Sequence, residues 1–126
     1  MSRMPNYALH GIRVFACPPD GKKLRSDHDA VDLIGEARGA DLILIPVERF
    51  DDDFFRLKTR IAGEIIQKFV TYGRRLAILG DISRYVAESA AFRDFVFEAN
   101  RGEHVWFVPN LEELRKRLSP EPPPAP

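Results

Sequence analysis

The chain has 126 residues, of which 44% are hydrophobic and 30% charged, and its 19 basic and 19 acidic side chains cancel. A chain of this length can fold as one domain without disulfides or a metal, and the lack of a net field argues against a nucleic-acid partner. The single cysteine, Cys17, cannot form an internal disulfide, and we find neither a signal-peptide pattern nor an apolar run long enough to span a bilayer. We therefore expect a cytoplasmic protein with no membrane partner.

Two end segments are predicted to lie outside the folded domain. Residues 1–6 are expected to form a flexible arm, and residues 119–126, SPEPPPAP, an extended and disordered Pro-rich tail that cannot build a core. The domain itself is expected over residues 7–118.

The first part of the domain is predicted to contain a hairpin and a helix. Residues 7–17 hold two short apolar segments separated by Gly11, a pattern typical of a β-hairpin. Ser26 with Asp29 three positions later indicates an N-terminal helix cap, and the amphipathic helix that follows is expected to end at Gly39.

Two later segments, residues 42–47 and 76–79, are apolar at nearly every position, which is typical of strands in a sheet covered by helices on both faces. Between them, residues 53–72 are predicted to form one long amphipathic helix. Its buried side would carry Phe54, Leu57, Ile61, Ile65 and Phe69, with Ala62, Ile66 and Val70 widening the stripe. Because this stripe exceeds what one sheet face needs, a homodimer that buries the excess is one expectation.

The last part of the domain is predicted to contain a helix, a strand and a final helix. The first of these helices begins at Ser83 as N-cap and ends at residues 100–102. A strand over residues 104–109 leads through Asn110, a capping residue paired with Glu113, into the final amphipathic helix. That helix carries Leu111, Leu114 and Leu118 on its buried side.

The resulting element order is β-β-α-β-α-β-α-β-α. Short loops and right-handed crossovers make the later strands parallel, with helices packed around them. The sequence therefore predicts an α/β fold, a single domain with a mostly parallel sheet and an N-terminal hairpin. Gly35 and Gly63, which lie inside predicted helices, are expected to permit close approach of a neighbouring backbone.

Six segments carry a resemblance to a known family. They are DAVDLIGE from Asp29 to Glu36, then IPVERFDDDFFRL, AGEIIQKF, LAILGDIS, FRDFVFEANRG and VWFVP. Together they resemble the bacterial family catalogued as domain of unknown function 4180, over the chain from Tyr7 to Leu118. The resemblance implies membership of that family but no particular activity, substrate or cofactor.

The element order is also similar to that of the STAS domain, named for sulfate transporters and anti-sigma-factor antagonists, which implies a STAS-like sheet. In the antagonists, the helix after the third strand starts at a serine that a partner kinase phosphorylates. Aligning residues 42–47 with that strand places Asp51, Asp52 and Asp53 at the junction. Because no hydroxyl residue stands there, we expect no phosphorylation switch at this position.

A candidate site is predicted at the carboxyl ends of the strands, where loops and helix N-termini converge in an open parallel sheet. We call this set of residues the rim. It consists of Glu48, Arg49, Phe50, Asp53, Asp81, Ser83 and Arg84, with Cys17 and Asn110 following the outer strands.

Metal and catalytic chemistry find little support in this set. Glu48, Asp81 and one of Asp51 to Asp53 could hold a divalent cation, but a response-regulator site would also need a lysine after the last strand, where Pro109 and Asn110 stand. Helix capping and a favourable interaction with the helix dipole explain the three aspartates without any metal. No histidine is placed where it is expected to activate Cys17 as a nucleophile. No phosphate-binding glycine motif is present either. We therefore predict no catalytic residues, cofactor or metal.

A binding function is the remaining expectation. Phe50, Phe54 and Phe55 flank the acidic turn, and an exposed aromatic side chain beside fixed charges is a common anchor for a partner. The alternative is that Phe54 is core and only Phe50 or Phe55 is exposed. The sequence thus favours a non-enzymatic regulatory or protein-interaction module, with a protein partner or a homodimer. A small-molecule-binding or metal-binding protein, or an enzyme, with its site at the same rim is the alternative function.

Overall fold

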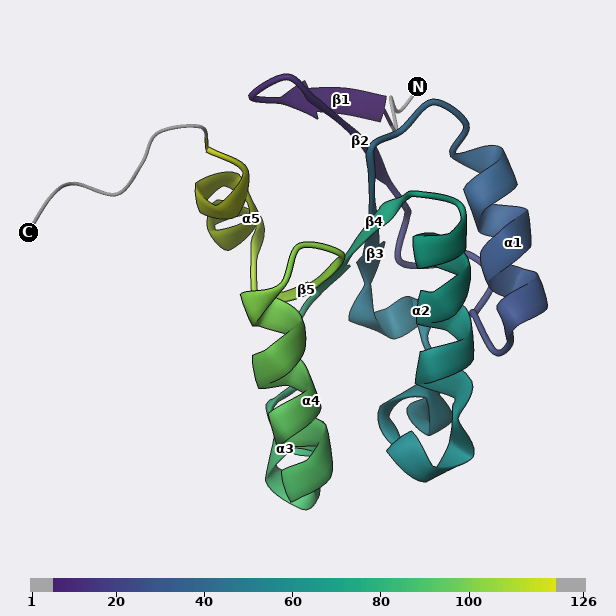
Figure 1. Ribbon diagram of the computed structural model, residues 1–126, viewed down its shortest axis with the longest axis vertical. Helices are drawn as coiled ribbons and strands as arrows, with labels where there is room; N and C mark the ends of the chain where they lie inside the picture. Colours follow the sequence, from purple (N-terminus) through teal and green to yellow (C-terminus); the bar gives the residue numbers. More distant parts are fainter. Residues whose placement is uncertain (1–5, 120–126) are drawn as a thin grey trace, which may run out of the picture.

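The structure, a computed structural model, describes residues 6–119 (Figure 1). The predicted arm and tail lie outside the described residues, apart from Asn6, which begins the first strand, and Ser119. The described chain forms one α/β domain whose element order agrees with the prediction. No helix among these residues is both long and apolar enough to cross a bilayer.

Five strands form a single mixed sheet in which spatial order follows sequence order. The strands are β1 (Asn6–Leu9), β2 (Ile12–Ala16), β3 (Leu42–Pro46), β4 (Arg75–Leu79) and β5 (Val105–Val108). β1 and β2 pair antiparallel, through a two-residue turn in which His10 and Gly11 have φ of 52° and 83°. The other neighbours pair parallel, so the predicted hairpin and parallel sheet are confirmed.

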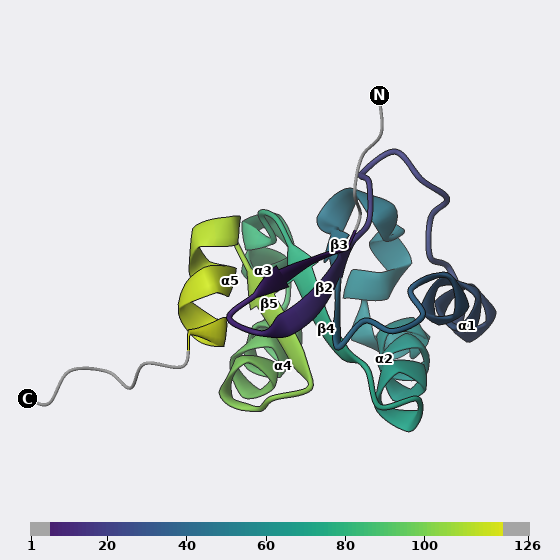
Figure 2. The ribbon, with the colours of Figure 1, turned by 90° about the horizontal axis from the view of Figure 1, so that it is seen from above.

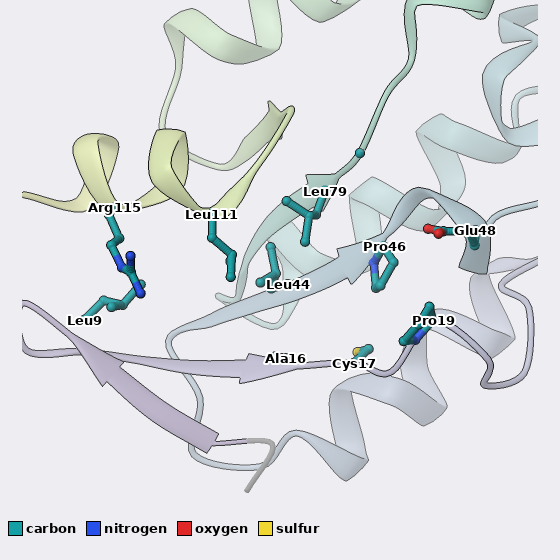
Figure 3. A pocket seen from close by; sticks show the side chains of 11 residues that line it. Leu9, Ala16, Cys17, Pro19, Leu44, Pro46, Glu48, Leu79, Leu111 and Arg115 are labelled. Atoms are coloured by element: carbon teal, nitrogen blue, oxygen red, sulfur yellow. The ribbon is translucent and has the colours of Figure 1, made fainter. Parts of the chain in front are cut away.

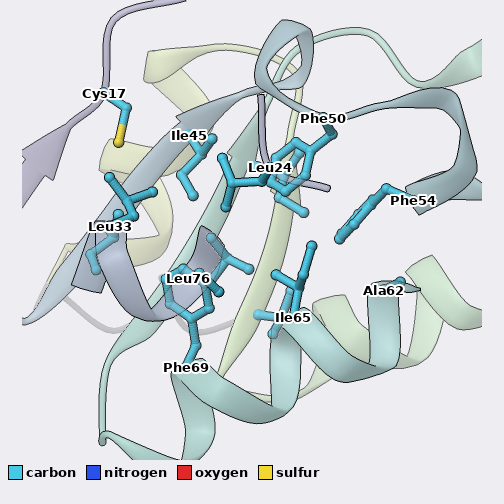
Figure 4. Packing of buried hydrophobic residues seen from close by; sticks show 14 of the residues in the cluster. Cys17, Leu24, Leu33, Ile45, Phe50, Phe54, Ala62, Ile65, Phe69 and Leu76 are labelled. Atoms are coloured by element: carbon cyan, nitrogen blue, oxygen red, sulfur yellow. The ribbon is translucent and has the colours of Figure 1, made fainter. Parts of the chain in front are cut away.

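One face of the sheet is covered by the crossover helices. These are α1 (Asp27–Glu36), α2 (Ile61–Thr71) and, between β4 and β5, α3 (Ser83–Glu88) followed by α4 (Ala90–Arg101). Right-handed crossovers between strands added in one direction place these helices on the same side. Ile45 and Leu76 of the sheet and Phe69 of α2 belong to the core on this side (Figure 4), and Phe92 of α4 joins the same core.

The opposite face has much less cover. It is packed by α5 (Leu111–Leu118), which follows β5, and the β1–β2 hairpin curls over the same side (Figure 2). Leu114 and Leu118 of α5 pack with sheet residues such as Ala77 and Trp106. Since α5 has eight residues, it covers only part of a five-stranded sheet.

The predicted helix over residues 53–72 is wrong in its first two turns. The chain instead forms two 3-10 turns, Asp52–Phe55 and Leu57–Thr59, and α2 begins only at Ile61, after Arg60 in the left-handed region with φ of 67°. The Thr59 hydroxyl explains the break, because it donates to the carbonyls of Asp53 (2.7 Å) and Arg56 (2.8 Å) and accepts from the N–H of Ile61. Such local bonds offer the backbone an alternative to helix.

The predicted helix from Ser83 is likewise two helices. Ser89 is extended, and its hydroxyl accepts from the N–H of Phe92 at 3.1 Å, so this residue caps α4 and separates it from α3. Ser83 is not a cap, because Ile82 occupies the N-cap position of α3. The predicted caps at Ser26 and Asn110 are confirmed by hydrogen bonds from backbone N–H groups three residues later.

The expectation for the two helical glycines is wrong. A Cβ atom added at Gly35 or Gly63 would meet no heavy atom within 4 Å, apart from the glycine's chain neighbours and its own helix backbone. Neither glycine therefore permits a close approach, and each only lowers the helix propensity of its segment.

Candidate functional site

The partly covered face of the sheet contains an apolar cleft of about 560 Å³ (Figure 3). Its floor is formed by side chains of three neighbouring strands and its walls by the hairpin, the loop after β2 and α5. The lining residues are Leu9, Ala16, Cys17, Pro19, Leu44, Pro46, Glu48, Leu79, Gly80, Leu111 and Arg115. We call this the α5 cleft.

The register explains why the floor is continuous. Ala16 of β2 lies beside Leu44 of β3, and Pro46 of β3 lies beside Leu79 of β4. Side chains alternate between the two faces of a sheet, so these residues point to the α5 side. Leu111 is 41% exposed, so apolar surface remains accessible at the edge of the cleft.

Gly80 closes the carboxyl end of the floor. Its φ of 142° lies in a region that favours glycine, and an added Cβ would lie 3.0 Å from the Cβ of Val47. The N–H of Gly80 donates to the carbonyl of Val108 at 2.9 Å. This end of the cleft is therefore closed by hydrogen-bonded backbone that packs against Val47.

Two charged side chains stand at the ends of the cleft. Glu48 follows β3 in a 3-10 turn, Val47–Arg49, and its carboxylate extends toward Pro46, whereas Arg115 of α5 extends toward Leu9 (Figure 3). Both are exposed, and within residues 6–119 neither forms a hydrogen bond or an ion pair. The cleft therefore offers one anionic group and one cationic group without partners in the described chain.

Arg49, the next residue of the rim, is committed to the structure. It is 7% exposed, and its guanidinium donates to the carbonyls of Lys22 (2.6 Å) and Pro18 (2.9 Å). Its own carbonyl accepts from the N–H of Leu24 at 2.7 Å. Arg49 thus clamps the loop that carries Pro19, one wall of the cleft.

The aspartates of the acidic turn form ion pairs rather than helix caps. Each carboxylate lies 3.2 Å from a guanidinium: Asp51 from Arg25, Asp52 from Arg84 and Asp53 from Arg56. Asp51 holds the N-cap position of a 3-10 turn without a side-chain cap bond, so the predicted capping role is wrong. These partly or largely exposed pairs each contribute little stability.

The rim residues after β4 are also engaged in local contacts. Oδ1 of Asp81 accepts from the N–H of Ser83 at 2.9 Å, and hydrogen bonds from the Ser83 side chain and backbone lower the pKa of Asp81. Arg84 donates to Asp52 and to the Tyr85 hydroxyl, and its guanidinium lies 4.5 Å from the centre of the Tyr85 ring. Tyr85 also donates to Asp52 at 2.8 Å, which is the main cause that lowers the pKa of Asp52.

The phenylalanines near the acidic turn are all core residues. Phe50 is 3% exposed, Phe54 is 0% and Phe55 is 2%, so the expectation that Phe50 or Phe55 is an exposed anchor is wrong. The rings of Phe50 and Phe54 lie 4.3 Å apart, and Phe55 stacks on Tyr85 at 4.0 Å. A parallel bridge between Leu24 and Phe50 places the latter beneath the clamped loop.

Cys17 and the acidic residues do not assemble into a reactive centre. The Cys17 side chain packs in the helix-covered core, 6% exposed, and burial raises the pKa of its thiol to about 11. It is the small buried hydrophobe that a lone cysteine usually is. Residues 6–119 contain no group of three His, Cys, Asp or Glu side chains placed to hold a metal ion.

Of the predicted rim residues, Glu48 and Cys17 line the α5 cleft. Sequence reasoning missed the other end, Arg115, although it lies four residues after Leu111 and three before Leu118, on the apolar side of its helix. A charged residue on the apolar side of an amphipathic helix is the signal by which Arg115 could have been found. The order of the strands could also have indicated the cleft. When all three crossover helices lie on one face of the sheet, only the last helix remains to cover the opposite face.

The fold and the cleft define a class of protein: a single-domain α/β protein with a mostly parallel sheet, one face of which is only partly covered. The family model described as "Domain of unknown function (DUF4180)" matches residues 9–118. The chain therefore belongs to this family, as its resemblance implied. No curated protein and no solved structure matches the chain.

Proposed function

We propose that this protein binds a small organic molecule in the α5 cleft. The observation that carries the proposal is a hollow of about 560 Å³ with an apolar floor and two charged residues at its margin. Sites for small molecules are typically clefts of about 300–1000 Å³, mostly apolar with a few polar groups that orient the ligand. The position also supports it, because the cleft reaches the carboxyl ends of β3 and β4.

The surroundings favour this function over the protein-interaction module. Arg49, Asp81 and Arg84 are engaged within the fold, and Phe50 is buried, so little of the predicted rim is free for a partner. By contrast, removal of apolar surface from water contributes about 25 cal/mol per Å². A ligand that covers Leu111 and its neighbours is stabilised by the free energy of burying their apolar surface.

The other predicted functions keep specific but narrower support. A homodimer or protein partner stays a prediction, and the exposed apolar side chains of Val70 (39%) and Tyr72 (49%) near the end of α2 favour it. The STAS likeness stays a prediction supported by element order. A cytoplasmic location stays a prediction supported by the single buried cysteine.

The test uses anilinonaphthalene sulfonate, an apolar anionic dye that fluoresces in dry clefts. Ala16→Phe places a ring on the floor of the cleft, whereas Ala91→Phe adds the same ring at an exposed position of α4. We expect the first variant to weaken dye binding at least tenfold and the second to leave it unchanged, with both proteins folded by circular dichroism. Equal binding by both variants, or no binding by the wild type, would contradict the proposal.

A further inference from the structure

We propose that the ligand of the α5 cleft is a bipolar amphiphile, with an anionic group at Arg115, a cationic amine at Glu48 and an apolar body between them. This inference rests on the proposed function and names its ligand class. It starts from the two charges at opposite ends of one apolar cleft (Figure 3).

Glu48 and Arg115 differ from the charged residues near them in having no ion-pair partner within residues 6–119. Asp51, Asp52, Asp53 and Arg84, which lie close to Glu48 in the sequence or the fold, all have ion-pair partners. Within the described chain, Glu48 and Arg115 have none. They also do not pair with each other, so a molecule that enters the cleft meets two solvent-exposed charges of opposite sign that have no partner within residues 6–119.

The two ends of the cleft select different chemical groups. A guanidinium presents paired donors that match a carboxylate or phosphate. A glutamate carboxylate is only an acceptor, so it selects an ammonium or another N–H donor. Between them the floor offers Ala16, Leu44 and Pro46, which contribute no polar side-chain atoms. The arrangement therefore favours charge at both ends of a ligand and apolar groups in its middle.

The separation of the two charged ends sets the length of the ligand. Arg115 extends to Leu9, whose partner Ile12 begins β2, whereas Glu48 follows Pro46 at the end of β3. Along the strand direction, the positions of Ile12 and Pro46 in the sheet are about six residues apart, or roughly 20 Å of backbone. Both side chains extend inward and shorten this gap, so a chain of about six to twelve carbon atoms is the range to test.

The experiment measures dissociation constants by titration calorimetry for three matched series: ω-amino carboxylates, alkanoates and alkylamines of equal length. For the wild type we expect one length of ω-amino carboxylate to bind at least about tenfold more tightly than either singly charged analogue. Glu48→Gln should abolish this advantage and leave alkanoate binding unchanged, and Arg115→Gln should leave alkylamine binding unchanged. Glu88→Gln, at an exposed acid of α3, is the control and should change nothing.

A charge reversal sharpens the test. Glu48→Lys should transfer the preference to the dicarboxylate of the same length. If alkanoates bind as tightly as ω-amino carboxylates and Glu48→Gln has no effect, the bipolar ligand class is wrong while binding in the cleft stands. If neither these probes nor the dye binds the wild type, the proposed function itself fails.

Discussion

The clamp formed by Arg49 holds one wall of the α5 cleft, and the effect of its removal on stability can be worked out from its contacts. Its buried guanidinium makes two hydrogen bonds to the loop that carries Pro19, at 2.6 Å and 2.9 Å. Arg49→Met keeps the aliphatic stem but removes both bonds and leaves two carbonyls without their donor. A hydrogen bond to a charged group contributes about 1.5–3 kcal/mol, but the variant also avoids the desolvation of a buried cation. We therefore expect the free energy of unfolding to fall by about 2–4 kcal/mol.

Urea denaturation followed by the fluorescence of Trp106, the only tryptophan, measures this change. The midpoint should fall with little change in the slope. Arg56→Met is the control, because its ion pair with Asp53 is 59% and 53% exposed at the two side chains. Its loss should cost less than about 1 kcal/mol. A midpoint for Arg49→Met as close to the wild type as that of Arg56→Met would refute the clamp.

A double-mutant cycle measures the coupling free energy between Gly21 and the guanidinium of Arg49. In Gly21→Ala the new Cβ would lie 2.6 Å from Cζ of Arg49, so the guanidinium must move and weaken its bonds. In the Arg49→Met background this conflict disappears, because the thioether has no hydrogen bonds to preserve. We expect the two losses to be clearly non-additive. Additive losses would show that Gly21 is constrained by something other than Arg49.

Three further predictions concern the rest of the fold. Gly63→Ala should raise the free energy of unfolding by up to about 1 kcal/mol, since the added methyl group meets no neighbour; an unchanged or lower urea midpoint would contradict this. Cys17, whose pKa is raised to about 11 by burial, should resist Ellman's reagent at about pH 8 until the protein is unfolded, and rapid reaction of the native protein would show that the thiol is accessible. A hydrogen bond from the N–H of Arg25 is the main cause that lowers the pKa of Asp29. Asp29 therefore contributes stability that is present above its unfolded pKa and is lost as the pH falls below about 4. Asp29→Asn should reduce that loss in acid titrations monitored by circular dichroism.

The elements predicted well are those specified by local patterns. Continuous apolar runs indicate the strands β3 and β4. The caps at Ser26 and Asn110 depend only on residues three positions away. The hairpin turn needs positive φ at two adjacent residues, His10 and Gly11, and glycine adopts such a φ easily at the second. In each case the residues that decide the structure are neighbours in the sequence.

The helix boundaries that were missed depend on interactions that periodicity does not report. Phe54 and Leu57 continue the apolar spacing of α2, yet they belong to 3-10 turns that Thr59 stabilises through backbone hydrogen bonds. Ser89 similarly lies within an apolar pattern but acts as a cap. Neither break contains proline or glycine, so no strong breaker residue indicates it.

The site was predicted in part. The rule for parallel sheets places Glu48 correctly at the carboxyl end of a strand, but it does not say which face of the sheet is left open. That depends on α5, whose short length and position decide where the cleft lies. The burial of Phe50 could not be read either, because it results from the distant loop that Arg49 clamps.

The most direct test of the proposed site is a methyl NMR titration of leucine-labelled protein with the amino carboxylate that binds best. We expect shifts and intermolecular contacts at four leucines that line the α5 cleft, Leu9, Leu44, Leu79 and Leu111. Leu57, beside a second hollow next to α2, is the internal control and should not move. Shifts centred on Leu57, with the cleft methyl groups unchanged, would contradict the account.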